Sequence, residues 1–421
     1  MDRAEFELQL ERYADLIVGI GLNLQPGQRL TMVDAGRNQG TPIQLAPLVR
    51  QVVIKAYQAG SPFVDVIWGD EQLKLIRFEH APDESFDIFP EWLVDAVLKA
   101  GARGDALLNI SAASPDLLSG QDMERIGRWQ KTTLTHLEPF SNLIKRNAIN
   151  WNLVSAPVEG WAAKVFPDLP VEGAVEQLWQ VVFKMVRADQ PDPRRAWERH
   201  LADLQRRCDY FNHKRYTALH YRAPGTDLRV GLPAGQLWKG GRVTSERGVP
   251  FVPNLPTEEV FTLADRHRVD GRVRSTKQLS YGGQLIEDFE FEFAEGRVVN
   301  FSARQGGAAL QKLLDMDEGA RRLGEVALVP HSSPVSQSGL LFHNTLFDEN
   351  AASHLALGGA YRFTLRGGEA MSEAEFAAAG GNSSLIHVDF MVGCAEMEVA
   401  GVRADGQLEP VMRRGEWAFT V

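Results

Sequence analysis

A histidine and an aspartate lie two positions apart in the apolar segment LIHVDFMVG, residues 385–393. The run of apolar residues predicts a β-strand, in which successive side chains point to opposite faces. His387 and Asp389 then share one face. Burying an imidazole and a carboxylate together costs desolvation free energy unless another group compensates it. A divalent cation does so, because both groups are common Zn²⁺ ligands. A buried histidine–aspartate hydrogen bond is the alternative that this motif leaves open.

A second histidine occurs in LFDENAASHLALGGAY, residues 346–361. Asn350 suits an N-cap position and predicts a helix that begins at Ala351, with His354 one turn inside it. Five residues along a helix turn the chain by about 140°, so Glu349 must lie at the entry, outside the helix, to share a site with His354. The alternatives are a solvated charge for Glu349 and a buried core histidine for His354.

Two further segments place glutamates at or near predicted strands. NLPTEEVFT, residues 254–262, carries Glu258 and Glu259 directly before a Val-Phe-Thr run, and RLGEVALVP, residues 322–330, carries Glu325 within an apolar run. The alternatives are exposed turn acids for the first pair and, for Glu325, a charge that blocks pairing at a sheet edge. Three carboxylates together with the two histidines are enough ligands for two divalent ions about 3.5–4 Å apart, an arrangement that activates water.

Composition and missing motifs exclude several other classes. The 45 Lys and Arg residues against 55 Asp and Glu residues give a net charge of −10, and the absence of a basic cluster argues against a nucleic-acid partner. The two cysteines exclude a disulfide framework and a cysteine-rich zinc site. GxSxG, HExxH and GxxxxGK[ST] motifs are absent. Since the sequence also shows neither a signal peptide nor an apolar run of about 18 residues, we expect no membrane association and a cytoplasmic protein.

The first 190 residues predict one α/β domain. Apolar residues recur at helical spacing over 4–20, and RLTMVDAG (29–36), APLVRQVVIKAYQAG (46–60) and VDVIWGD (64–70) alternate strand, helix and strand. This order predicts a parallel sheet, and residues 90–111 repeat the helix-then-strand pattern. Gly60 is expected to end the helix at 46–60.

A connecting helix over 191–213 and a β-rich domain over 214–421 are expected to follow. Asp192 and Pro193 suit the start of the helix. Beyond it, short strands alternate with Gly-rich turns, for example FEFEF-AEG-RVVNF (289–301), which predicts a hairpin, and YRFTL (361–365). A length of 421 residues agrees with two or three domains.

In their order along the chain, the four motifs NLPTEEVFT, RLGEVALVP, LFDENAASHLALGGAY and LIHVDFMVG resemble the successive motifs of the M29 family of metallopeptidases, to which aminopeptidases T and S belong. LERYADLIVGIGLNLQPGQ (10–28), VDVIWGDEQLKLIRFEHAP (64–82) and GTDLRVGLPAGQLWKGG (225–241) extend the resemblance over essentially the whole chain. The resemblance implies an α/β N-terminal domain followed by a β-rich α+β C-terminal domain that binds the metals. It also implies a homodimer acting on short peptides.

Carried over residue by residue, the resemblance implies a metal-ligand set and an activity. The implied ligands are Glu259, Glu325, Glu349, His354, His387 and Asp389. They would hold two divalent ions, Zn²⁺, Co²⁺ or Mn²⁺, in an aminopeptidase that hydrolyses the N-terminal peptide bond with an activated water. Glu325 or Glu349 would carry the proton and Tyr361 would donate a hydrogen bond to the oxyanion. Whether Glu349 is a ligand or only a nearby acid stays open. An amidase acting on a non-peptide and a non-enzymatic, metal-stabilised dimer are the alternatives.

Overall fold

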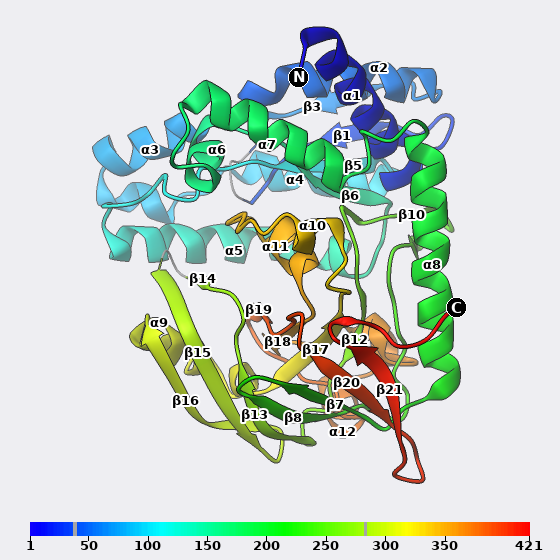
Figure 1. Ribbon diagram of the computed structural model, residues 1–421. Coiled ribbons are helices and arrows are strands. Elements are labelled where there is room, and N and C mark those ends of the chain that lie inside the picture. The colour runs from blue at the N-terminus through cyan, green and yellow to red at the C-terminus, as the bar shows by residue number, and fades with distance from the viewer. Residues whose placement is uncertain (37–39, 282–283) are drawn as a thin grey trace. The chain divides into compact units, whose positions relative to one another are not determined.

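The structure, a computed structural model, describes residues 1–36, 40–281 and 284–421 (Figure 1). The chain forms two compact units, and each contains more than one segment. The first unit consists of Met1–Arg199, Arg242–Pro256 and Leu341–Leu346. The second consists of His200–Gly241, Thr257–Leu340 and Phe347–Val421.

A parallel sheet of five strands forms the centre of the first unit. Its strand order is β11–β6–β5–β1–β3, and every neighbouring pair is parallel. The strands are β1 (Leu30–Met32), β3 (Val64–Val66), β5 (Ala106–Ser111), β6 (Trp151–Ser155) and β11 (Asn254–Leu255). Four short strands form two small two-stranded sheets: β2 (Thr41–Pro42) pairs with β4 (Trp68–Gly69), and β9 (Val243–Thr244) pairs with β10 (Pro250–Phe251). The parallel sheet predicted from the sequence is thus confirmed.

Helices connect the strands of this unit. They are α1 (Arg3–Leu16), α2 (Ala46–Gln58), α3 (Glu71–His80), α4 (Glu91–Arg103), α5 (Met123–Lys145), α6 (Glu159–Val165) and α7 (Val171–Met185), with shorter turns η1 (Ile17–Gly21), η2 (Ile43–Leu45) and η3 (Asp83–Asp87). The predicted helices at 4–20 and 46–60 are both present. Gly60 follows α2 with φ +90°, a conformation that glycine adopts without strain and that ends the helix as expected.

Two antiparallel sheets make up most of the second unit. The smaller has the order β12–β17–β18–β19, with β12 (Val260–Leu263), β17 (Leu323–Leu328), β18 (His354–Gly358) and β19 (His387–Met391). The larger has nine strands: β7 (Ala218–Ala223), β8 (Thr226–Gly231), β13 (Val269–Arg274), β14 (Leu279–Tyr281), β15 (Gln284–Ala294), β16 (Arg297–Gln305), β20 (Glu398–Val402), β21 (Leu408–Arg413) and β22 (Glu416–Trp417). The predicted hairpin at 289–301 is β15 with β16, in which Phe291 pairs with Phe301.

Few long helices occur in the described part of the second unit. The predicted connecting helix is α8 (Pro193–Lys214), which begins in the first unit and ends in the second. The short helix α11 (Thr345–Asp348) likewise begins in the first unit and ends in the second. The others are α9 (Gly307–Leu314), α10 (Pro334–Gln337) and α12 (Glu373–Ala378), with η4 (Gly319–Arg321), η5 (Glu349–Ala351), η6 (Arg362–Thr364) and η7 (Gly368–Ala370).

Two local predictions are wrong. The segment YRFTL contains the 3₁₀ turn η6 rather than a strand. No helix begins at Ala351: the 3₁₀ turn η5 ends there, and His354 opens strand β18 instead. In β18 every residue is buried, so pairing on both sides with β17 and β19 overrides the helical preference of the alanines.

The two antiparallel sheets share one hydrophobic core. Val326, Leu355 and Phe390 of the smaller sheet belong to the same buried cluster as Phe289 and Phe291 of the larger. The ring of Phe390 lies 5.1 Å from that of Phe291. Because side chains alternate along a strand, the neighbours of these core residues point to the other face of the smaller sheet.

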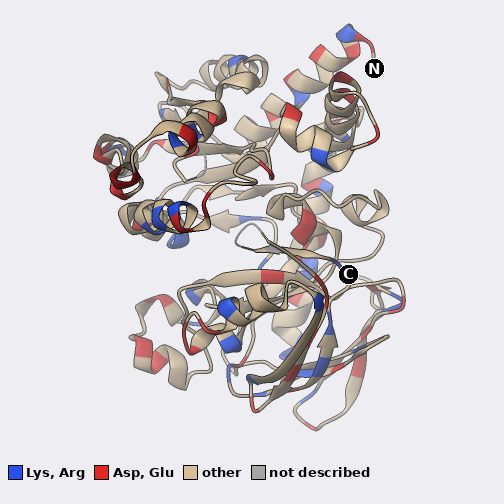
Figure 2. Cartoon of the chain, turned by 90° about the vertical axis from the view of Figure 1, so that its left-hand side faces the viewer, with Lys and Arg blue, Asp and Glu red and all other residues tan. Residues whose placement is uncertain are grey.

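Charged residues are spread over the chain. Figure 2 shows acidic and basic residues interspersed along the helices, with no single basic region in that view. Among the described residues, no helix combines the length and the apolar character needed to cross a membrane.

Candidate metal centre

The face of the smaller sheet that points away from the shared core carries the candidate residues. Glu325 on β17 pairs with Ala356 on β18, and Ala356 pairs with Asp389 on β19. Residues that pair directly across a sheet point to the same side, as do residues two apart along a strand. His354 and His387 therefore share the face of Glu325 and Asp389. The small side chain of Ala356 leaves space between the two carboxylates.

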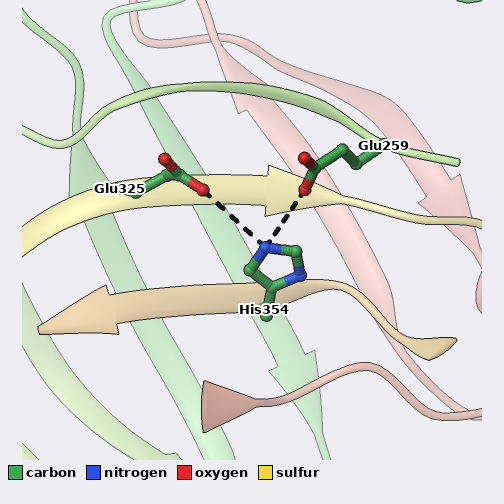
Figure 3. Close-up of side chains that lie close together, drawn as sticks. All are labelled: Glu259, Glu325 and His354. Atoms are coloured by element: carbon green, nitrogen blue, oxygen red, sulfur yellow. Dashed lines mark ion pairs between the residues drawn. The ribbon is translucent and has the colours of Figure 1, made fainter. Parts of the chain in front are cut away.

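The first cluster joins three different strands. Nε2 of His354 lies 3.1 Å from a carboxylate oxygen of Glu259, the residue directly before β12, and 3.7 Å from Oε1 of Glu325 (Figure 3). The His354 side chain is only 2% exposed. One ligand atom from each of the three residues falls within 4.8 Å of the others, which is the spacing of a metal site.

The second cluster shares Glu325 with the first. Nε2 of His387 lies 3.4 Å from Oδ1 of Asp389 and 3.9 Å from Oε2 of Glu325. These three residues also place ligand atoms within 4.8 Å of one another. The shared face that the sequence predicted for His387 and Asp389 is confirmed.

Each histidine is oriented by a backbone carbonyl. Nδ1 of His354 bonds to the carbonyl of Ala352 at 3.1 Å, and Nδ1 of His387 bonds to the carbonyl of Gly359 at 2.7 Å. A carbonyl oxygen only accepts, so Nδ1 carries the proton in both rings. Nε2, which faces the carboxylates, is then available as a ligand in the neutral ring.

Burial and mutual charge shift the pKa values of the clustered groups. Burial, and then the charges of Asp389 and Glu259, raise the pKa of Glu325, against the opposing effect of the two imidazoles. Burial lowers the pKa of His387, but the carboxylates of Asp389 and Glu325 outweigh it and raise the pKa to about 10. His354 behaves likewise: Glu259 and Glu325 raise its pKa well above the usual value, although burial opposes this.

The donor set fits divalent metal ions. Within the described residues, Oε2 of Glu325 and Oδ1 of Asp389 are buried and have no hydrogen-bond partner. Buried carboxylate oxygens without donors are costly unless a cation compensates them. Carboxylate oxygens and imidazole nitrogens together suit Zn²⁺, Co²⁺ and Mn²⁺.

Glu349 and Tyr361 lie beside the clusters but not within either group. Glu349 is half-buried in the turn η5, and desolvation followed by the charges of Glu259 and Asp389 raises its pKa well above the usual value. The ring of Tyr361 lies 4.9 Å from that of His387. Burial and then the charge of Glu325 raise the pKa of Tyr361, which keeps its hydroxyl protonated.

The structure decides between alternatives that the sequence left open. Glu258 is buried and ion-paired with His200 at 3.6 Å, so Glu259 alone of the two adjacent glutamates joins the cluster. Strand β17 lies between β12 and β18, so the interpretation of Glu325 as an edge charge is wrong. Sequence reasoning missed the side chain of Asn350, which accepts a hydrogen bond from the Glu258 backbone at 2.6 Å. Its only sequence signal, suitability as a helix cap, pointed to a different role.

Comparison with known proteins gives the family. The family model described as Thermophilic metalloprotease (M29) matches residues 6–417. This chain belongs to the M29 family. Aminopeptidase 2 of Geobacillus stearothermophilus is 47% identical over 414 residues, covering 98% of each chain. Aminopeptidase T of Thermus thermophilus is 45% identical and covers 98% of this chain and 99% of its own.

A solved structure has the same fold as this chain. Wild-type AmpT from Thermus thermophilus superimposes with a TM-score of 0.92 at 43% sequence identity, covering 98% of this chain and 100% of that chain. The mixed α/β architecture, with its parallel sheet and its large antiparallel sheet, is therefore that of a known metalloprotease fold.

Proposed function

We propose that this M29 chain is a metal-dependent aminopeptidase that hydrolyses the N-terminal peptide bond of short peptides. The observation that carries the proposal is the pair of ligand groups that share Glu325 on one face of a buried sheet. Two relatives that match nearly the whole chain are named aminopeptidases, which supports this activity over the amidase and binding-protein alternatives.

The ligand assignment follows the two groups. Glu259, Glu325 and His354 would hold one ion, and Glu325, His387 and Asp389 would hold the other, so that Glu325 belongs to both groups. We propose Zn²⁺, Co²⁺ or Mn²⁺ as occupants, two per subunit. When bound, two such ions would lower the pKa of a water and polarise the scissile carbonyl.

Glu349 is best suited to carry the proton. Glu325 belongs to both ligand groups, so its oxygens are engaged, whereas Glu349 lies outside both. Burial and then the charges of Glu259 and Asp389 raise the pKa of Glu349. A carboxyl group outside both ligand groups can take a proton from the attacking water and return it to the leaving amine. Of the two roles that the sequence left open for Glu349, we therefore propose the nearby acid and not the ligand.

Tyr361 donates a hydrogen bond to the developing oxyanion. Its raised pKa keeps the hydroxyl protonated near neutral pH, and its ring lies against that of His387. A donor in this position typically contributes about 3–4 kcal/mol to the stability of the transition state.

The test is release of p-nitroaniline from leucine p-nitroanilide by metal-stripped protein. Zn²⁺, Co²⁺ or Mn²⁺ is then added back, and an N-acetylated substrate is run in parallel. Activity that requires both metal and a free amine is expected. Turnover of the acetylated substrate at the same rate would favour the amidase. No turnover with any metal, with two ions bound, would favour the peptide-binding dimer.

Three further expectations from the sequence stay predictions: the homodimer, the cytoplasmic location, and the division into domains at 1–190 and 214–421 joined by 191–213. A measured molecular mass of about twice that of the chain in solution would support the first.

A further inference from the structure

A buried asparagine joins the segments on either side of the second ligand group. Asn382 is fully buried, in the connection between α12 and β19. Its Nδ2 donates to the carbonyl of Gly319 at 2.8 Å and to that of Gly358 at 2.6 Å. Its own backbone carbonyl accepts from the Ala360 N–H at 2.7 Å. One side chain thus ties the turn η4 and the end of β18 to the segment that leads into His387.

The end of β18 in turn sets the orientation of His387. Gly358 has φ +104°, and a Cβ there would lie 2.2 Å from the carbonyl oxygen of Ile386, so only glycine fits. The Gly359 N–H donates to that same Ile386 carbonyl at 2.7 Å. The Gly359 carbonyl accepts the Nδ1 proton of His387, also at 2.7 Å. The placement of residues 358–359 therefore fixes both the tautomer and the direction of the His387 ring.

Asp317 holds the same connection from its other side. Its carboxylate accepts from the Ser384 hydroxyl at 2.8 Å and from the Leu385 N–H at 2.6 Å. A Cβ on Gly319 would lie 2.0 Å from the carbonyl oxygen of Ser383, so the two backbones pack in direct contact. The segment between Asn382 and His387 is consequently fixed at both ends.

The histidine of the first ligand group is oriented by a different contact. His354 bonds through Nδ1 to the carbonyl of Ala352, which precedes it in the chain. Among the hydrogen bonds of the described residues, none joins the side chain of Asn382 or Asp317 to Ala352 or His354. Loss of Asn382 should therefore affect the two groups unequally.

We propose that Asn382 is a positioning residue for His387 and serves the second metal site without serving the first. It acts by holding the Gly358 carbonyl, so that the next carbonyl, that of Gly359, receives the His387 Nδ1 proton. Hydrogen bonds to a ligand histidine commonly change metal affinity by about 10–100-fold. This inference rests on the proposed two-ion function.

Asn152 provides a matched control in the first unit. It is also fully buried, and its Nδ2 also donates to two backbone carbonyls, those of Val252 and Pro253. In the described part of the chain its Oδ1, like that of Asn382, accepts no hydrogen bond. Asn152→Ala therefore removes two comparable hydrogen bonds from an equally buried position. An effect that Asn382→Ala shows and Asn152→Ala does not is then due to the position of His387 and not to a general loss of stability.

The first experiment is calorimetric titration of metal-stripped protein with Co²⁺, combined with the visible spectrum of the bound ion. In Asn382→Ala we expect one of the two binding steps to weaken by about 10–100-fold while the other stays at the wild-type value. Asn152→Ala should keep both steps. Equal affinities in Asn382→Ala and wild type, or equal weakening of both steps, would overturn the proposal.

The second experiment needs no metal. In ¹⁵N-histidine-labelled, metal-stripped protein, the hydrogen-bonded Nδ1–H of His387 should give a slowly exchanging downfield signal, assigned by its absence in His387→Gln. Asn382→Ala should lose it and Asn152→Ala should keep it; its persistence in Asn382→Ala refutes the inference. If Asn382→Ala does not fold, Asp317→Asn is used, with the same expectation at smaller amplitude. A wild-type protein that binds fewer than two ions would contradict the proposed function, while this signal would still decide the role of Asn382.

Discussion

Replacing Glu325 with glutamine removes one charge from both ligand groups at once. Its two oxygens lie 3.7 Å from Nε2 of His354 and 3.9 Å from Nε2 of His387, and it is the residue common to both clusters. Glutamine keeps the shape of the side chain. The variant therefore reports on the carboxylate charge and its ligand oxygens rather than on packing.

The distances set the expected size of the effect. Two unit charges about 4 Å apart interact by about 4 kcal/mol at an effective dielectric constant of about 20. Desolvation of the buried carboxylate, which raises the pKa of Glu325, offsets part of this attraction. If about half of this attraction, about 2 kcal/mol, remains in each of the two ligand groups, loss of the Glu325 charge costs about 4 kcal/mol in total. This free energy corresponds to about 10³-fold in rate or affinity.

The assay measures kcat/KM on leucine p-nitroanilide and the metal retained after dialysis. Glu258→Gln is the control, because Glu258 is equally buried and adjacent in sequence to a ligand but is paired with His200. We expect Glu325→Gln to lose about 10³-fold in kcat/KM and to retain less metal, and Glu258→Gln to stay within about threefold of wild type. A Glu325→Gln protein that keeps two ions and loses less than tenfold in activity would refute the proposal that Glu325 serves both ligand groups.

Four further outcomes are expected. Glu349→Gln should lower kcat by about 10²–10⁴-fold while both ions stay bound, which metal analysis beside kinetics would check; loss of an ion would make Glu349 a ligand. Tyr361→Phe should lower kcat by about 10²–10³-fold with metal content unchanged, whereas an unchanged kcat would exclude the oxyanion role. Chelation should abolish activity and lower the melting temperature, because an ion at 1,000 times its Kd stabilises the folded state by about 4 kcal/mol; a melting temperature that does not change would contradict tight binding. Hydrogen bonds from Lys214 and Tyr216 lower the pKa of Glu409 from 4.5 to about 2, so its stabilisation is complete above about pH 4.5 and is lost as the pH falls towards 2. The difference in unfolding between wild type and Glu409→Gln, followed by circular dichroism, should shrink over that range, and a constant difference would contradict this linkage.

The parts of the site that follow local rules could be predicted from the sequence. His387 and Asp389 are two apart in an apolar strand, so alternation alone places them together. Glu259 directly precedes a strand, and Glu325 interrupts a run of apolar residues that is buried throughout. In each case the signal lies within one segment of fewer than ten residues.

The placement of His354 could not be predicted in this way. Its segment, Ala-Ala-Ser-His-Leu-Ala-Leu, has a composition that favours a helix, and Asn350 suits a cap. Strand pairing with β17 and β19 decides the outcome, and those partners lie some 30 residues away on either side. Nothing local encodes them. The family resemblance implied a site role for His354, and the structure places it in one of the two candidate ligand groups, although its predicted secondary structure was wrong.

The smaller antiparallel sheet holds the acidic and basic side chains of the candidate site close to one another. On one face of β18 and β19, Leu355 and Phe390 pack into the core, and on the other face His354 and Asp389 point into the site. The core contacts fix the backbone, so the carboxylates cannot move apart to relieve their repulsion. Protonation of His387, whose pKa is raised to about 10, then offsets part of the negative charge in the metal-free protein. A cation that replaces these protons meets ligands already in position, and its binding free energy is not spent on ordering them. The sheet therefore offers a divalent ion a set of carboxylates and imidazoles that is already arranged for binding.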